Sequence, residues 1–131
     1  MSGLKKDKKH IDVLHFEHQI WTSELNFYKD ELVVFDRRLG EMVNNYTDKE
    51  VLGHLEHFQN QFIIQNREIV QLLHDSREHE EFLAFAAQSA PVAIDHQSFA
   101  DHAQLRDRMA QFTKLYMEMK QEFKAYLSKI M

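Results

Sequence analysis

The sequence predicts an all-α protein, an antiparallel bundle of three long helices. Only three glycines and one proline occur in 131 residues, too few for the many tight turns of a β-sandwich or barrel. Apolar residues make up 44% of the chain, which is enough for one sizeable core. They recur at alternating steps of three and four, the spacing of a helix face. We therefore expect a single domain over residues 1–131, with residues 1–9 as a polar leader.

The first helix is expected over residues 10–44, before the turn-forming stretch 43–46. One apolar seam follows its whole length: Ile11, Leu14, His18, Trp21, Leu25, Tyr28, Leu32, Phe35, Leu39 and Met42. A second apolar stripe repeats every seven residues on another side: Val13, Ile20, Phe27 and Val34. Two stripes require two neighbours, and either the segment 76–88 or a second copy of the chain could supply the further surface. We favour the second copy and expect a homodimer.

The second helix is expected to begin at a capping box formed by Thr47 and Glu50. Its apolar pattern shifts near residues 74–76, where Asp75 and Glu78 would cap a fourth helix over residues 75–90. We favour the alternative of one helix continuing to about Gln88, since the segment is rich in Glu, Leu and Ala.

Pro91 is expected to end this helix, and residues 91–97 to form a connector. Ser98 and Asp101 then begin the last helix. Its seam also advances in steps of three and four: His102, Leu105, Met109, Phe112, Tyr116, Met119, Phe123, Tyr126 and Ile130. Short connections between the helices predict that neighbours are antiparallel.

Charge and composition narrow the classes of function. A formal net charge of −5 argues against nucleic-acid binding, which depends on Lys and Arg that neutralise phosphates. The chain has no cysteine, so disulfides, thiolate metal sites and iron–sulfur clusters are excluded. No apolar run approaches the roughly 18 residues of a membrane span, and the N-terminus lacks a signal-peptide core. We therefore expect a cytoplasmic protein without a membrane partner.

Three carboxylates and two histidines occupy unusual positions. Glu17, Glu24 and Glu31 are spaced by seven and lie between the two apolar stripes of the first helix. Buried acids need cations, hydrogen-bond donors or a metal. For any one of them, an equal alternative is pairing with an arginine of another helix face: Arg37, Arg38, Arg67, Arg106 or Arg108. His18 and His102 replace the leucine expected on a seam, and a buried neutral imidazole needs an acceptor or a metal.

An antiparallel arrangement would bring these groups to similar heights. Toward one end the estimate places Glu17, His18, His74 and His102. In the middle of the bundle it gathers Glu24, Glu31, His57, Gln61, Glu68 and Glu122. The complete set of candidate metal ligands is Glu17, His18, Glu24, Glu31, His54, His57, Glu68, His74 and His102.

Carboxylates and imidazoles on facing helices are how helical bundles hold metal ions. Iron is the favoured ion, with zinc, manganese or calcium as alternatives, and several carboxylates would favour more than one ion. Open coordination positions on iron would admit oxygen, and an enzyme of this kind would oxidise or hydroxylate a small molecule, or oxidise ferrous iron. The alternative is a non-catalytic homodimeric interaction module whose acids and histidines form ion pairs.

Short acid–histidine motifs accompany this layout. Asp7 with His10, and Asp12 with His15, have acid-x-x-His spacing, and His74 with Glu78 has the spacing His-x-x-x-Glu. The chain thereby resembles ferritin-like and hemerythrin-like metal-binding bundles, which implies a non-haem metal. It contains no Glu-x-x-His and no His-x-x-x-His, so neither family's ligand set carries over intact. Residues 14–18 and 105–109 also resemble small uncharacterised bacterial helical proteins, and that resemblance implies no function.

Overall fold

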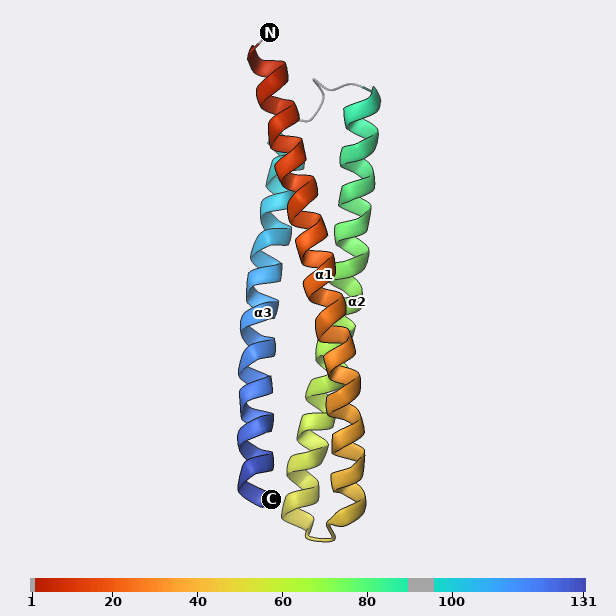
Figure 1. Ribbon diagram of the computed structural model, residues 1–131, viewed down its shortest axis with the longest axis vertical. Helices are drawn as coiled ribbons and strands as arrows, with labels where there is room; N and C mark the ends of the chain where they lie inside the picture. The colour runs from red at the N-terminus through yellow and green to blue at the C-terminus, as the bar shows by residue number, and fades with distance from the viewer. Residues whose placement is uncertain (1, 90–95) are drawn as a thin grey trace.

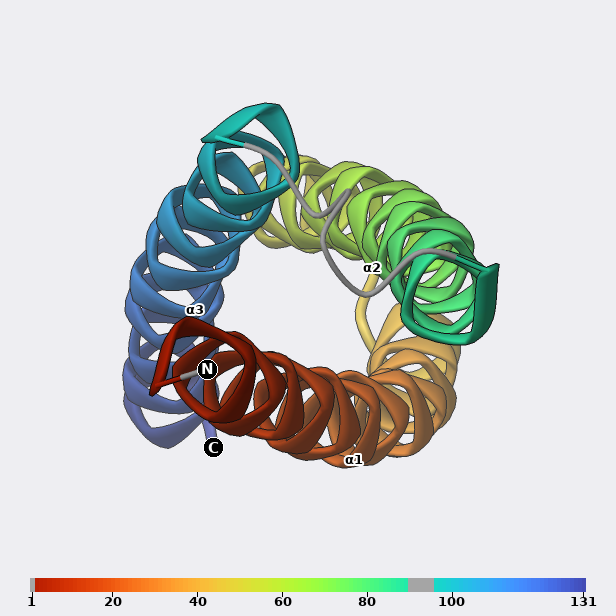
Figure 2. The same cartoon turned by 90° about the horizontal axis from the view of Figure 1, so that it is seen from above.

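The protein folds into three long helices. The structure is a computed structural model that describes residues 2–89 and 96–131. These form α1 (Ser2–Asn45), α2 (Lys49–Ser89) and α3 (His96–Ile130), with no strand in the described ranges. In Figure 1 the chain descends along α1, returns along α2 and descends again along α3. Seen from above, the three helices are arranged around a common axis (Figure 2). The prediction of an all-α chain with three helices is confirmed.

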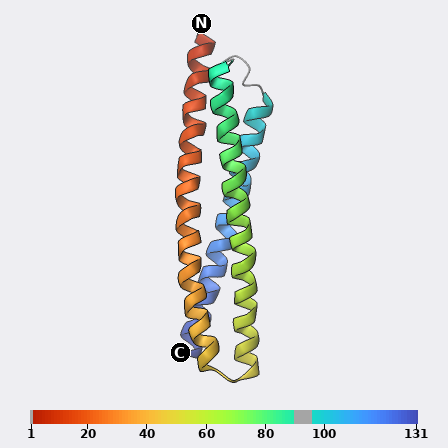
Figure 3. The ribbon, with the colours of Figure 1, turned by 90° about the vertical axis from the view of Figure 1, so that its right-hand side faces the viewer.

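The helices are nearly as long as the molecule. From the side, α3 passes behind α2, and its C-terminal end comes close to the end of α1 (Figure 3). There the Tyr46 hydroxyl donates a hydrogen bond of 2.8 Å to the carbonyl oxygen of Ile130. This contact fastens the C-terminus of α3 to the turn that joins α1 and α2.

α1 begins earlier than the sequence pattern predicted. Its helical backbone starts at Ser2, not near His10, so the segment expected to be a polar leader extends the helix. Lysine is a good helix former, and four lysines occur between residues 5 and 9. The apolar pattern marks only the part of a helix that packs against other helices. The helix start predicted from that pattern was therefore too late.

The start of α2 is set by Asp48, not by Thr47. The Asp48 carboxylate accepts hydrogen bonds from the backbone N–H groups of Glu50, at 2.8 Å, and Val51, at 3.2 Å. These are two of the four N–H groups that a helix start leaves without a partner. Asp48 is therefore the N-cap, one residue beyond the predicted position.

α2 has no break at Asp75. It continues to Ser89, which confirms the favoured prediction and excludes a separate helix within residues 75–89. α3 begins at His96, two residues before the predicted Ser98. Pro91 and most of the predicted connector lie outside the described residues.

The core follows the predicted seams. Fully buried residues from the three helices include Leu25, Leu39, Leu55, Ile69, Tyr116 and Phe123. The second stripe on α1 stays in contact with solvent, with Val13 51%, Ile20 39%, Phe27 59% and Val34 59% exposed. No helix in the described ranges has both the length and the apolar character needed to cross a membrane.

The cap at Asp48 leads to a stability prediction. Asp48→Ala should lower the free energy of unfolding by about 1 kcal/mol, because two N–H groups lose their acceptor. Thr47→Ala is the matched control and should change it much less. Urea unfolding followed by circular dichroism measures both variants. An equal loss in the two would show that the neighbouring threonine shares the capping role.

Candidate metal centre

Three histidines meet in the core, one from each helix. His18 of α1, His79 of α2 and His102 of α3 are 3%, 9% and 1% exposed. Their ring centroids are 4.9 to 5.4 Å apart. One ring nitrogen of each lies within 4.8 Å of those of the other two. These three residues are called the histidine layer below.

The histidine layer exists because the helix seams bring it together. His18 and His102 lie on seams, as the sequence predicted. Trp21, one turn after His18, stacks on the His102 ring at 4.9 Å with an interplanar angle of 26°. The indole excludes water from one side of the imidazoles, so they lie among apolar groups and not at the surface.

Carboxylates bind the outer nitrogens of two of these histidines. Glu80 contacts His18 through Nδ1 and also binds His15. Glu17 lies 3.2 Å from His102 Nε2 and accepts hydrogen bonds of 2.5 and 2.9 Å from the Arg106 guanidinium. Each carboxylate orients its ring by accepting the outer N–H, as carboxylates do behind metal-binding histidines.

The inner nitrogens are left facing each other or without a partner. His18 Nε2 lies 3.2 Å from His79 Nδ1. His102 Nδ1 is buried and makes no hydrogen bond within the part of the chain that the structure describes. If each outer nitrogen carries the proton, His18 Nε2 accepts a hydrogen bond from His79 Nδ1, and Nδ1 of His102 is the inner nitrogen with a free lone pair. A metal ion that bound all three rings would replace the His18–His79 hydrogen bond and give the Nδ1 of His102 a partner.

Burial and hydrogen bonds set the protonation states of His102, Glu17 and Glu80. Burial lowers the pKa of His102 to about 4, although Glu17 opposes the shift. The Arg106 hydrogen bonds hold the pKa of Glu17 below its usual value. Burial alone would raise the pKa of Glu80, but the hydrogen bonds from His18 and His15 outweigh it and lower the pKa. At neutral pH His102 is therefore neutral and both carboxylates are ionised.

Glu31 belongs to a different polar cluster, in the middle of the bundle. Its carboxylate accepts hydrogen bonds from the Tyr116 hydroxyl at 2.7 Å and from Lys120 at 2.8 Å. Burial, and then Glu31 itself, raise the pKa of Tyr116 far above its usual value. Both oxygens of Glu31 have partners, so this cluster is explained without a metal.

Glu68 and His74 also lie apart from the histidine layer. Glu68 Oε1 is 3.7 Å from Arg108, which bonds Asp75 at 2.8 Å. His74 points to solvent and pairs with Glu78 at 3.1 Å. His74, Asp75 and Glu78 could offer three ligand atoms, but two of the three are exposed, as acidic surface groups commonly are.

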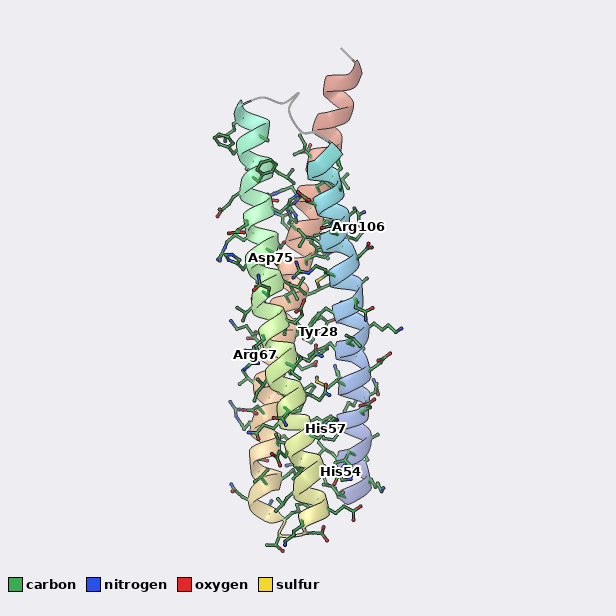
Figure 4. All side chains as sticks on the ribbon, turned by 180° about the vertical axis from the view of Figure 1, so that it is seen from behind. Tyr28, His54, His57, Arg67, Asp75 and Arg106 are labelled. Atoms are coloured by element: carbon green, nitrogen blue, oxygen red, sulfur yellow. The ribbon has the colours of Figure 1, made fainter. Side chains whose placement is uncertain are left out.

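The structure leaves Glu24, His54 and His57 exposed, so these three do not join a buried site. His54 and His57 lie near the lower end of the bundle in Figure 4, far from Arg106 near the upper end. His54 packs against Tyr126, with ring centroids 4.9 Å apart. Of the nine predicted ligands, the structure therefore gathers three at one end: Glu17, His18 and His102.

His79 and Glu80 are central to the site, and the predicted ligand set omitted both. The omission came from the apparent shift in pattern near residues 74–76. If Ser76 and His79 are included as core residues, the seam continues from Leu72 to Leu83 in steps of four, three and four. That regular spacing was the signal that would have found His79.

The depressed pKa of His102 gives a pH prediction for metal-free protein. Between pH 6.5 and about 4, an unfolded His102 binds a proton that the folded one does not. Stability is therefore lost as the pH falls through this range, by about 3 kcal/mol in total. Urea unfolding with chelator present should show this slope in the wild type, a reduced slope in His102→Leu, and an unchanged slope in His74→Leu. Equal slopes in all three proteins would contradict the assignment.

Comparison with models of protein families, with curated proteins and with solved structures gives no match.

Proposed function

We propose that the protein binds one divalent transition-metal ion through His18, His79 and His102. The observation that carries the proposal is the buried Nδ1 of His102, which lacks a partner within the described residues. Leaving a buried acceptor unpaired costs about 1–3 kcal/mol, and a metal ion would satisfy it. The carboxylates Glu17 and Glu80 support the proposal because each holds the outer nitrogen of a proposed ligand.

The three imidazole ligands narrow the choice of metal ion. Calcium and magnesium prefer oxygen, whereas zinc, iron, nickel and copper accept imidazole. In a tetrahedral zinc site with Zn–N bonds of about 2.0–2.1 Å, ligand nitrogens lie about 3.3 Å apart. His18 Nε2 and His79 Nδ1 form a hydrogen-bond contact of 3.2 Å, a separation that a zinc ion could take over with little movement of either ring. Zinc is therefore the first candidate and iron the second. One ion suffices, since Glu31 and Glu68 are engaged elsewhere.

Three protein ligands leave one coordination position open, as in catalytic zinc sites. A metal ion there would act as a Lewis acid and lower the pKa of a bound water. The chain's own part is to hold His102 neutral, to orient His18 and His102 through Glu80 and Glu17, and to exclude water with Trp21. If the ion is iron, the same position would admit oxygen. Oxidation or hydroxylation of a small molecule, or of ferrous iron, remains a prediction that depends on iron.

Metal binding is tested by titrating untagged, chelator-treated protein with Zn²⁺ in a calorimeter and by elemental analysis after dialysis. We expect about one ion per chain, and loss of at least tenfold in affinity in His18→Ala, His79→Ala or His102→Ala. His74→Ala is the matched control, because that histidine is exposed and lies outside the histidine layer. Equal binding by the wild type and by His102→Ala would contradict the proposal.

The exposed stripe on α1 supports a second proposal, that two copies pair through Val13, Ile20, Phe27 and Val34. In an antiparallel pair centred between Ile20 and Phe27, Val13 of one copy faces Val34 of the other, and Ile20 faces Phe27. The heptad spacing thus makes the stripe complementary to itself. Pairing would give the second apolar stripe of α1 the neighbour that the sequence pattern predicted for it. It does not exclude metal binding, and the non-catalytic interaction module would use the same surface.

Sedimentation equilibrium tests this pairing. The wild type should dimerise, and Phe27→Glu should be monomeric because it would bury two charges against apolar side chains. Phe85→Glu is the matched control, since Phe85 is 68% exposed on α2 and outside the stripe. A monomeric wild type, or equal weakening by both substitutions, would overturn the proposed pairing.

A further inference from the structure

Each of the three helices carries an acid directly beside its member of the histidine layer. In sequence order these pairs are Glu17-His18 on α1, His79-Glu80 on α2 and Asp101-His102 on α3. The acid comes before the histidine in α1 and α3, and after it in α2. Glu17 and Glu80 each bind a histidine of another helix, so the same role is open to Asp101 of the third pair.

The reversed order in α2 compensates for its reversed direction. Seen from the end shown in Figure 2, α1 and α3 run away from the viewer, whereas α2 runs toward the viewer. Successive residues are about 100° apart around a right-handed helix, clockwise when the helix recedes and counterclockwise when it approaches. Each acid therefore lies about 100° counterclockwise from its histidine in all three helices. Because the histidines point toward the common axis, every acid is directed sideways, toward the next helix around the ring.

The two contacts of Glu17 and Glu80 follow this rule. Glu17 of α1 lies 3.2 Å from His102 of α3, and Glu80 of α2 contacts His18 of α1. In Figure 2 both steps, from α1 to α3 and from α2 to α1, go around the ring in the same direction. One step remains to close the ring, from an acid of α3 to the histidine of α2.

Asp101 and His79 occupy the positions that this last step requires. Both line one groove between α2 and α3, and Asp101 is partly buried there. His79 directs its Nδ1 toward His18, at 3.2 Å, so the outer nitrogen of its ring is Nε2. An acid on this side of α3 therefore faces the same groove as the histidine that still needs an outer carboxylate.

We propose that Asp101 is the third outer carboxylate of the site and accepts a hydrogen bond from Nε2 of His79 when a metal ion is bound. Asp101 is a positioning residue, because it acts through His79 and does not bind the ion itself. This inference rests on the proposed metal site. It gives each of the three ligands a carboxylate supplied by a neighbouring helix, so that every pair of helices is joined by one such contact.

The tautomer of His79 explains why this contact belongs to the metal-bound protein. Without metal, His79 donates its Nδ1–H to His18, so its Nε2 carries a lone pair and has no proton to donate to a carboxylate. An ion bound at Nδ1 takes the lone pair of that nitrogen, and the proton must then be on Nε2. The Nε2–H requires an acceptor, which Asp101 supplies from the same groove. A carboxylate in this position fixes the ring and raises its basicity toward the metal.

Titration of the untagged full chain with Co²⁺, followed by visible absorption, tests this role. Asp101→Ala should bind Co²⁺ about tenfold more weakly than the wild type and with an altered spectrum, because the His79 ring loses its support. Asp101→Asn should recover part of the affinity, since its amide oxygen still accepts the N–H but carries no charge. Glu17→Ala, which removes an outer carboxylate already in contact with its histidine, should cause a loss of similar size.

Asp107→Ala is the matched control, because Asp107 is an exposed acid of α3 that lines a different groove. It should bind Co²⁺ as the wild type does. A wild type that does not bind Co²⁺ would overturn the metal site itself. If the wild type binds and Asp101→Ala is no weaker than Asp107→Ala, only the role of Asp101 is overturned.

The tautomer gives a second measurement that needs no variant. Proton–nitrogen NMR of zinc-loaded wild type should find the ring proton of His79 on Nε2, whereas metal-free protein should carry it on Nδ1. A proton on Nδ1 in the zinc-loaded protein would overturn the proposed contact, since Nε2 would then have nothing to donate to Asp101.

Discussion

Packing of three imidazoles in an apolar core is the constraint on which this end of the bundle depends. His18, His79 and His102 must keep an outer nitrogen near a polar group while their rings stay dry. Glu17 and Glu80 meet this need from the flanks, and Arg106 in turn fixes Glu17. Because these contacts join all three helices, they also specify how the helices align. The cost is an incompletely paired interior, since His102 Nδ1 has no hydrogen-bond partner among the described residues.

The cluster around Glu31 shows what a purely structural polar cluster looks like in the same bundle. Glu31 also lies between apolar stripes, yet Tyr116 and Lys120 occupy its two oxygens. Such a fully paired cluster gives the core a unique arrangement and needs nothing more. The histidine layer differs because His102 Nδ1 remains unpaired within the described chain. Glu17 and Glu31 thus occupy similar positions on α1, but different side chains of α3 face them. His102 and Arg106 contact Glu17, whereas Tyr116 and Lys120 contact Glu31.

Periodicity predicted the fold well because packing itself sets the spacing of apolar residues. It placed His18 and His102 in the core, and the structure confirms both positions. Periodicity fails where a core position holds a polar residue, as at Ser76 and His79, and there the predicted phase was lost. Periodicity also does not indicate how far a long side chain extends from its helix. Arg106 and Lys120 bind Glu17 and Glu31 from the edge of α3, so the expected ladder of three equivalent acids separates into two paired residues and exposed Glu24.

Two buried polar atoms lack partners in the described chain, Ser76 Oγ and His102 Nδ1, and both lie at the histidine end of the core. Replacing either residue with an apolar one should make the metal-free fold more stable, since an unpaired buried group is destabilising. Residues that oppose stability in a core of otherwise regular packing are characteristic of binding sites. Ser76 precedes His79 by three residues on α2, so both unpaired atoms lie near the three imidazoles.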